Sequence, residues 1–364
     1  MAGSRQVAAV LQFCEQYHRP SYMTVAATPL HVGDPREIQR MVRAIRIHSY
    51  GGPEVMKFEE VDVGKLDTGL VRIRNMAVGL NYIDTYHRTG LYPIPAMPGV
   101  IGMEGAGEVL AVGHGVSDFK VGDRIAYANP IGAYAEERLI PAERLVKLPD
   151  TIDDKIAAAM MLQGMTAQYL LRRTFKVGPE TVMLFHAAAG GVGLIVCQWA
   201  RHLGATIIGT VGSEEKAVLA KEAGCTHVIN YRSENFVERV KEITGGKGCD
   251  VVYDGIGKDT YPGSLDCLKP FGLWVSFGNA SGKIDNFDLG LLAAKGSLYA
   301  TRPTLFTYTA KREDLLASAG ELFDVVGRGI VKISVNQTYP LAQAAQAHRD
   351  LEARKTTGST VLLP

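Results

Sequence analysis

The sequence of 364 residues has no uninterrupted apolar run of about 18 residues or more, which is the length a helix needs to cross a bilayer. It also has no excess of charge of one sign: 39 lysines and arginines oppose 38 aspartates and glutamates, a formal net charge of +1. This balance does not favour nucleic acid or an anionic membrane as a partner, so any anion must be bound by local charge. With 46% hydrophobic and 21% charged residues, we expect a soluble globular protein of roughly two domains.

Cysteine is scarce. The five cysteines are Cys14, Cys197, Cys225, Cys249 and Cys267, and they occur singly along the chain. None of them has a neighbour at the close spacing typical of metal or redox sites. A reduced, cytoplasmic environment fits this pattern best.

The first forty residues differ from the rest of the chain. Apolar residues recur at helical spacing between positions 7 and 17, but Arg5 and Arg19 are the only arginines or lysines in the first twenty positions. Organelle presequences have more arginine than this and less acid. We expect residues 1–40 to be a loosely ordered extension or the product of an upstream start. A targeting segment and a packed extra element are the alternatives.

The segment from residue 42 to about residue 138 predicts a compact β-rich domain. Short β-like runs broken by glycine occur at residues 42–47, 70–79, 105–112 and 123–128. After Arg302 the pattern predicts one amphipathic helix at 313–326 and a short strand around 331–335. We expect the tail that follows to return to the first domain.

From Thr181 the pattern changes to short apolar runs that alternate with helical stretches. The six expected strands are 182–185, 205–211, 227–230, 250–253, 273–277 and 297–300. Glycines end the intervening helices, for example Gly204 and Gly224. The alternation indicates βαβ units, and therefore an α/β fold with a doubly wound, six-stranded parallel sheet.

The run from Thr181 to Ala200 carries the strongest functional signal. A buried strand is followed by a turn of small residues and then by an apolar helix at 194–203. In the dinucleotide-binding fingerprint, Ala188 takes the first glycine position, with Gly190 and Gly193 in the other two. Such a turn can merely pack a helix on a strand, but at the first of six strands it indicates a pyrophosphate site at a helix N-terminus. The candidate contacts are Gly190, Gly191, Val192 and Gly193.

The second strand indicates which dinucleotide is bound. A site that prefers NAD has an acidic residue roughly 20 positions after the turn, and no carboxylate follows Val211 directly. The candidate contacts for a ribose 2′-phosphate are Gly212, Ser213, Lys216, Tyr231 and Arg232. These residues favour NADPH as the cofactor. The alternative is that Lys216 is a solvated helix residue paired with Glu214 or Glu215.

Several stretches, in the same order along the chain, resemble the medium-chain dehydrogenase/reductase superfamily over essentially all of residues 42–364. They are residues 51–55, 79–86, 90–93, 185–193, 275–279, 295–299 and 302–303. Within the superfamily the chain is similar to the zinc-free quinone oxidoreductases of the zeta-crystallin type. This resemblance implies a GroES-like β-barrel domain beside the Rossmann domain.

The sequence departs from the zinc-dependent alcohol dehydrogenase branch at the metal ligands. The segment 81–84 takes the place of the first ligand, a cysteine, and Met103 takes the place of the histidine. No cysteine occurs between Cys14 and Cys197, where a structural-zinc lobe would need four. A thioether is a poor zinc ligand, so we expect no metal. Glu104, next to Met103, is expected to be a buried, hydrogen-bonded acid near the cleft.

The resemblance also implies the site residues. Asn81 would orient the acceptor carbonyl, Tyr86 would donate to its oxygen, and Tyr92 would stack on it; packing roles for the two tyrosines are the alternative. Arg302 or Pro303 would close the cleft. The implied cofactor contacts are Asn81, Tyr82, Ile83, Asp84, Thr166, Tyr169, Phe277, Gly278, Asn279, Pro303, Thr304 and Arg354. For Arg354 a plain surface position is the alternative.

These observations favour an NADPH-dependent quinone reductase, because a quinone accepts hydride or single electrons without a Lewis acid. An enoyl or enone reductase is the enzymatic alternative. A non-catalytic crystallin-like or RNA-binding protein is the alternative of another class, although no basic, aromatic-interleaved run supports RNA.

The expected domain organisation has three parts: an extension at residues 1–40, a catalytic domain at 41–164 plus 303–364, and a Rossmann domain at 165–302. The resemblance implies a homodimer in which the sixth strand pairs with its symmetry mate.

Overall fold

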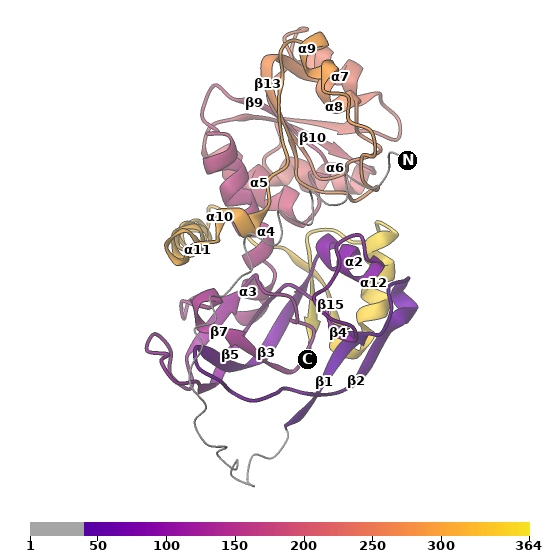
Figure 1. Ribbon diagram of the computed structural model, residues 1–364. Coiled ribbons are helices and arrows are strands. Elements are labelled where there is room, and N and C mark those ends of the chain that lie inside the picture. Colours follow the sequence, from indigo (N-terminus) through magenta and orange to yellow (C-terminus); the bar gives the residue numbers. More distant parts are fainter. Residues whose placement is uncertain (1–39) are drawn as a thin grey trace, which may run out of the picture. The chain divides into compact units, whose positions relative to one another are not determined.

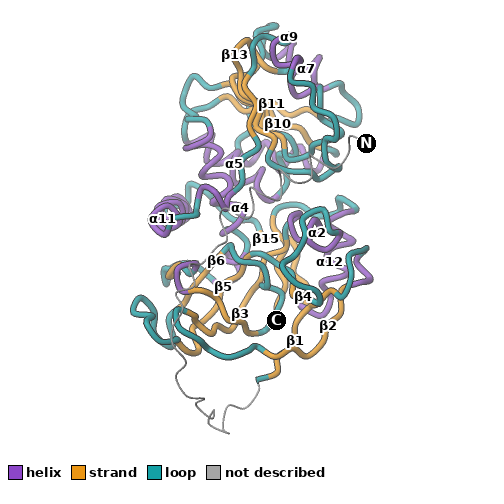
Figure 2. The backbone as a smooth tube through the Cα atoms, viewed as in Figure 1, coloured by secondary structure: helices purple, strands orange, loops and turns teal. Residues whose placement is uncertain are grey.

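The computed structural model describes residues 40–364, so the expectations for residues 1–39 lie outside the described part. Strands gather in two places: a parallel sheet that contains β9 and β10, and a β-rich part that contains β1, β3 and β5 (Figure 1). The tube view shows helices packed around the parallel sheet and few helices in the β-rich part (Figure 2). The predicted fold class is confirmed.

The parallel sheet has six strands. Their spatial order is β11 (His227–Asn230), β10 (Thr206–Val211), β9 (Val182–Phe185), β12 (Cys249–Asp254), β13 (Leu268–Ser276) and β14 (Tyr299–Thr301). Every neighbouring pair is parallel. Numbered along the chain, the order is 3-2-1-4-5-6, which puts a binding crevice outside the carboxyl ends of β9 and β12.

Helices cover both faces of this sheet. Successive residues of a strand point to opposite faces, so each strand contributes side chains to the packing on both sides. Met183 packs in the cluster that contains Cys197 and Trp199 of α5, whereas Leu184 packs in the cluster that contains Val240 of α7. The helices of this part are α5 (Gly191–His202), α6 (Glu214–Ala223), α7 (Phe236–Ile243), α8 (Gly263–Asp266) and α9 (Gly290–Ala294). Burial on both faces explains why the strands are continuous apolar runs.

The β-rich part contains a seven-stranded and a three-stranded sheet. The larger has the order β15 (Val335–Pro340), β16 (Ser359–Leu363), β3 (Leu70–Leu80), β5 (Glu104–Val112), β6 (Arg124–Tyr127) and β8 (Val146–Lys147), and β7 (Glu137–Pro141) also pairs with β3. The smaller has the order β2 (Met56–Asp62), β1 (Met41–Ile47) and β4 (Gly99–Val100). β16, close to the C-terminus, pairs antiparallel with β3.

The remaining helices connect or cover these sheets. They are α2 (Tyr82–Thr89), α3 (Asp154–Ala158), α4 (Met161–Tyr169), α10 (Leu305–Tyr308), α11 (Arg312–Gly327) and α12 (Ala344–Glu352). Short turns of helix occur at η1 (Pro53–Val55), η2 (Ala142–Arg144), η3 (Leu170–Thr174) and η4 (Leu341–Gln343). No helix within residues 40–364 is long and apolar enough to cross a membrane.

Two predicted strands begin two or more residues later than expected, and β13 (Leu268–Ser276) begins earlier than the expected 273–277. The strand expected at 297–300 begins only at Tyr299, because Ser297 has φ 55°, a left-handed conformation that a strand cannot contain. The strand expected at 331–335 is wrong: β15 begins at Val335. Val331 is instead buried in the loop after α11, where its N–H donates to the carbonyl of Val325 at 3.0 Å, and the backbone becomes extended where it pairs with β16.

Candidate active site

A cavity of about 800 Å³ opens where the carboxyl ends of the parallel strands face α2 and the C-terminal segment. Its walls include Tyr86 of α2, Thr166 of α4, Gly193 of α5 and Thr360 of β16. This volume lies within the usual range for small-molecule and cofactor sites, roughly 300–1,000 Å³.

The turn between β9 and α5 is built for close approach of an anion. Ala187 has φ 57°, and a Cβ at Gly193 would overlap the carbonyl oxygens of Ala187 and Ala188. Gly190 caps α5 without a side-chain hydrogen bond, and the first turn of the helix has no acidic residue. The N–H groups at this helix N-terminus therefore have no side-chain acceptor and are available to a phosphate.

Cations gather beyond the end of β10. Lys216 donates from Nζ to the backbone carbonyl of Arg354 at 2.8 Å, while Glu214 accepts from Asn230 instead, at 2.7 Å. Burial, then the nearby charges of Arg232 and Arg354, lower the pKa of Lys216. This mutual repulsion marks a place where an anion would relieve an excess of positive charge.

Ser213 and Tyr231 lie beside this cluster. The Ser213 hydroxyl accepts from the backbone N–H of Lys216 at 3.3 Å and so caps α6. The Tyr231 hydroxyl packs so closely on Gly212 that a Cβ there would be 2.5 Å away. Only glycine at position 212 lets the tyrosine lie against the end of β10.

Two tyrosines occupy the other end of the cavity. The rings of Tyr86 and Tyr92 meet edge to face, with centroids 5.3 Å apart. Asn279 donates from its backbone N–H to the Tyr86 hydroxyl at 2.9 Å and from Nδ2 to the Tyr92 hydroxyl at 3.0 Å. Burial raises the pKa of Tyr86 above its ordinary value. The Tyr86 hydroxyl therefore keeps its proton and can donate to an oxygen in the cavity.

Asn81 belongs to a buried polar chain at the floor of the cavity. Its Nδ2 donates to Glu104 at 2.5 Å, and its Oδ1 accepts from Gln163 at 3.0 Å. The second carboxylate oxygen of Glu104 accepts from the Leu162 N–H at 2.6 Å. Burial raises the pKa of Glu104 to about 8. The expectation of a buried, hydrogen-bonded acid at position 104 is confirmed.

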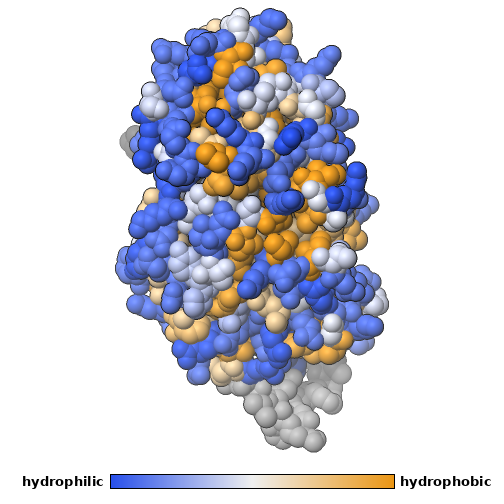
Figure 3. Space-filling model, turned by 180° about the vertical axis from the view of Figure 1, so that it is seen from behind, coloured by the Kyte–Doolittle hydropathy of each residue, from blue (hydrophilic) through white to orange (hydrophobic). Residues whose placement is uncertain are grey.

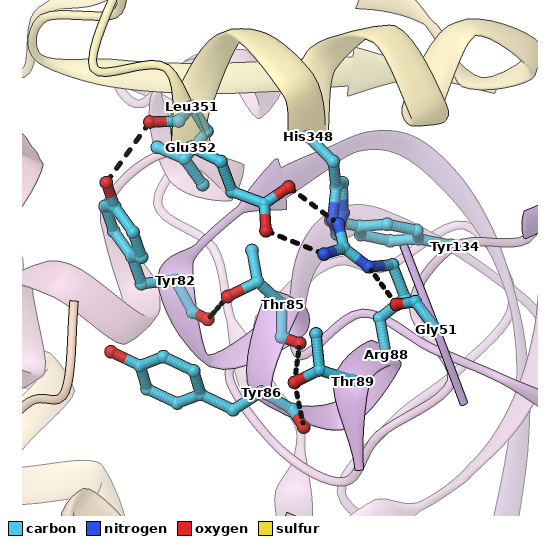
Figure 4. Close-up of polar contacts among 10 residues, drawn as sticks. All are labelled: Gly51, Tyr82, Thr85, Tyr86, Arg88, Thr89, Tyr134, His348, Leu351 and Glu352. Carbon is cyan, nitrogen blue, oxygen red and sulfur yellow. Dashed lines mark hydrogen bonds and ion pairs between the residues drawn. The ribbon is translucent and has the colours of Figure 1, made fainter. Parts of the chain in front are cut away.

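Helix α2 is fixed to the C-terminal helix α12 by the contacts drawn in Figure 4. Arg88, only 1% exposed, binds both carboxylate oxygens of Glu352, at 2.7 and 3.0 Å, and Nδ1 of His348 at 3.0 Å. The Tyr82 hydroxyl donates to the carbonyl of Leu351 at 3.1 Å. These bonds join the tyrosine-bearing helix to the segment that carries Arg354.

Two family models match the chain: the alcohol dehydrogenase GroES-like domain over residues 67–150 and the zinc-binding dehydrogenase over residues 191–311. A quinone oxidoreductase of Pseudomonas aeruginosa is 55% identical over 325 residues, which cover 89% of this chain and 100% of that protein. This chain belongs to the quinone oxidoreductase family of the medium-chain dehydrogenase/reductase superfamily.

Two further proteins are similar to this chain. The crystal structure of the Escherichia coli quinone oxidoreductase, complexed with NADPH, has a TM-score of 0.86 and 50% identity, over 88% of this chain and 100% of that one. A 2-haloacrylate reductase of Burkholderia sp is 51% identical over 89% of this chain and 99% of that protein.

Most residues that the sequence singled out line the cavity of this quinone oxidoreductase family member. They are Asn81, Tyr82, Ile83, Tyr86, Tyr92, Thr166, Tyr169, Gly190, Gly191, Val192, Gly193, Gly212, Lys216, Tyr231, Phe277, Gly278, Pro303, Thr304 and Arg354. Arg302 lines it as well.

Four predicted cofactor contacts are not in the cavity wall: Asp84, Ser213, Arg232 and Asn279. Asp84 is fully buried behind it, where it accepts from the Asn81 N–H at 2.8 Å and from the Tyr134 hydroxyl at 2.9 Å. Asp84 therefore caps α2 rather than facing the cavity. Ser213 caps α6, and Asn279 is engaged with the two tyrosines.

Several lining residues were missed by the sequence reasoning, among them Gln163, Asp259, Leu305, Phe306 and Gly358. The sequence does contain a signal for Gln163. It lies three residues before Thr166 and six before Tyr169 within α4, so the three share a helix face. Gly358 had none, since it reaches the site only through its bridge to Gly190.

The family model is named for zinc, but the donor atoms of this chain do not fit that metal. Met103, at the position expected for a histidine ligand, is 2% exposed and offers only a thioether. Within residues 40–364, no three His, Cys, Asp or Glu side chains come together in a way that could hold a metal ion.

Proposed function

We propose that this protein is an NADPH-dependent quinone reductase that needs no metal. One observation carries the proposal: a single cavity joins an anion-binding helix N-terminus and a cation cluster at one end to hydroxyl donors at the other. The Pseudomonas aeruginosa relative is named a quinone oxidoreductase, and the Escherichia coli structure is an NADPH complex, which supports both acceptor and cofactor.

The described residues fit NADPH. Gly190, Gly191, Val192 and Gly193 would bind the pyrophosphate at the N-terminus of α5. Lys216, with Arg354 and the Tyr231 hydroxyl, would bind the 2′-phosphate, which NADH lacks. Thr166, Tyr169, Phe277 and Gly278 would surround the nicotinamide end.

When bound, NADPH supplies a hydride from its nicotinamide ring. The protein then has to hold a flat acceptor against that ring and stabilise charge on the acceptor oxygen. The Tyr86 hydroxyl accepts from Asn279 and keeps its own proton to donate to this oxygen. Nδ2 of Asn81 uses one N–H on Glu104 and has a second N–H for the acceptor. Tyr92 would stack on the acceptor.

A second candidate is the reduction of a conjugated enone or enoate, which also accepts hydride without a metal. The 51% identical relative named 2-haloacrylate reductase favours it. The two candidates share the cavity and differ only in the acceptor.

We also propose the domain boundaries from the sequence: residues 41–164 plus 303–364 for the catalytic domain and 165–302 for the Rossmann domain. The β16–β3 pairing supports assigning the C-terminal tail to the first of these. A cytoplasmic location stays a prediction, supported by Cys197 and Cys225, which form no disulfide although their sulfurs are 3.3 Å apart.

A homodimer through β14 is proposed as well. β14 is the last strand of its sheet, so one of its edges has no partner strand among residues 40–364. Tyr299 on β14 is 62% exposed and Phe271 on β13 is 69% exposed. Figure 3 shows that apolar patches do occur on one face of the mostly hydrophilic surface. Replacing Tyr299 with Arg should shift sedimentation from dimer to monomer; a wild-type monomer would refute the proposal.

Steady-state assays of the full chain with a plain quinone, a 2-enone and a 2-enoate, each with NADPH and with NADH, test the main proposal. We expect quinone turnover with NADPH preferred. Absence of turnover with every acceptor, or a clear preference for NADH, would overturn it.

A further inference from the structure

Arg302 follows β14 and lies at the acceptor end of the cavity. Its Nη1 donates to the carbonyls of Ser276 and Gly278, at 2.8 and 2.9 Å, and to the Ser276 hydroxyl at 3.2 Å. Its Nη2 donates to the Tyr92 hydroxyl at 3.1 Å. The guanidinium is thus fixed in place, and Nε and one N–H of Nη2 stay available.

Every one of these partners is neutral. Among residues 40–364, no carboxylate lies within ion-pair distance of Arg302, whereas Arg88 pairs with Glu352 and Arg354 with Asp259. A fixed guanidinium with free donors and no counter-charge, at the edge of a cavity, is suited to binding a carboxylate or sulfonate.

The phosphates of the cofactor do not account for this cation. The 2′-phosphate cluster follows β10, and the pyrophosphate turn follows β9. Arg302 follows β14, which lies four strand positions from β10 in the sheet. At about 4.8 Å per strand, the two strand ends are roughly 19 Å apart. Arg302 is therefore at the end where the acceptor binds, beside Tyr86 and Tyr92.

We propose that Arg302 binds an anionic substituent of the acceptor, so that the preferred substrates are conjugated carbonyl compounds that carry a carboxylate or sulfonate. This inference rests on the proposed reductase function and specifies its substrate class. The reaction balances as acceptor plus NADPH plus one proton giving reduced acceptor plus NADP⁺. For a quinone two ring oxygens become hydroxyls; for an enoate the β-carbon receives the hydride and the α-carbon the proton.

The test compares two acceptors that share one ring system: 1,4-naphthoquinone and 1,4-naphthoquinone-2-sulfonate, both at saturating NADPH. The variant is Arg302→Gln, and Arg302→Lys keeps the charge. Arg349→Gln, on the exposed side of α12, is the matched control. Because the sulfonate changes the reactivity of the ring itself, the quantity compared is the ratio of variant to wild-type kcat/KM for each acceptor.

We expect Arg302→Gln to lower kcat/KM about 10- to 100-fold more for the sulfonate than for the neutral quinone. Arg302→Lys should retain most of the selectivity. In the wild type, added salt should lower kcat/KM for the sulfonate but not for the neutral quinone. This measurement does not depend on how the variants fold. Equal losses on both acceptors, or equal salt dependence, would overturn the inference and leave the reductase function intact. No turnover of either acceptor would instead refute the proposed function.

Discussion

The carboxamide of Asn81 is oriented by Glu104, whose Oε1 accepts from Asn81 Nδ2 at 2.5 Å. Gln163 donates to the opposite side of the same amide, at 3.0 Å, so the amide cannot turn over without losing both bonds. The other Glu104 oxygen accepts from the Leu162 N–H. Both oxygens therefore face donors, an arrangement that suits the ionised carboxylate.

The first prediction concerns Glu104→Gln. Burial raises the pKa of Glu104 to about 8, so the wild type has a neutral side chain at pH 6 and a carboxylate at pH 9. A glutamine can accept only one of the two N–H bonds. We expect kcat at pH 9 to fall about tenfold, the cost of roughly one hydrogen bond to a charged group, with little difference at pH 6. The control is Glu60→Gln, an exposed position on β2. An equal loss at both pH values would indicate a purely structural role.

The second prediction concerns stability. Burial raises the pKa of Glu104 to about 8 and that of Asp84 to about 7, above their values in an unfolded chain. Between about pH 5 and pH 8 the folded state thus keeps protons that the unfolded state has released. The free energy of unfolding should fall as pH rises through this window, by up to about 1.4 kcal/mol per pH unit for each group. Urea titrations at several pH values should show a smaller slope for Glu104→Gln, and an unchanged slope would contradict the assignment.

Local patterns were enough to predict the parallel sheet. The strand at 182–185 and the glycine-rich turn after it are encoded by consecutive residues, and β9 and β11 match the expected bounds. Contacts between distant residues were not predictable in this way. Gln163 meets Asn81 across 82 positions, and Cys197 meets Cys225 across 28, through packing that no short window contains. For Asp84 the family resemblance implied a cofactor contact, but the residue is buried and caps α2.

The third prediction concerns Lys216→Ala. Lys216 lines the cavity, and its Nζ is hydrogen-bonded only to the neutral carbonyl of Arg354 in the described part of the chain. Loss of this cation should raise the Kd of NADPH about 10- to 100-fold and change that of NADH less than about threefold. Fluorescence titration with both cofactors measures the two constants. Lys221→Ala, later on α6, is the control. An unchanged NADPH affinity would show that the 2′-phosphate binds elsewhere.

The fourth prediction concerns Tyr86→Phe. The hydroxyl of Tyr86 accepts from Asn279 and has one proton left to donate into the cavity. Its removal should lower kcat for a quinone about 10- to 100-fold, with a smaller change in KM, because the bond strengthens as charge develops on the acceptor oxygen. Since burial raises the pKa of Tyr86, its ionisation should leave no inflection in the wild-type rate below pH 9. Steady-state rates from pH 6 to pH 9 test both statements. A variant with wild-type kcat would leave Tyr86 a packing role.

The last prediction concerns the bond between α2 and α12. Arg88→Met keeps an unbranched apolar stem but removes the guanidinium, which leaves Nδ1 of His348 without its donor and Glu352 without its partner. His348 is fully buried, and burial followed by the charge of Arg88 lowers its pKa to about 3, so it cannot supply a compensating charge near neutral pH. The free energy of unfolding should fall by about 1–3 kcal/mol, the cost of leaving the buried Nδ1 of His348 without a donor, because the Glu352 side chain is 37% exposed and water can solvate its carboxylate. The control is Arg349→Met, at an exposed position on α12, which should lower the free energy of unfolding by less than about 0.5 kcal/mol.

Because α12 leads into Arg354, the folded Arg88→Met protein should also bind NADPH more weakly than the control does. If Arg88→Met were less stable but bound NADPH as well as the control, the position of α12 beside the cofactor site would not depend on its bonds to α2.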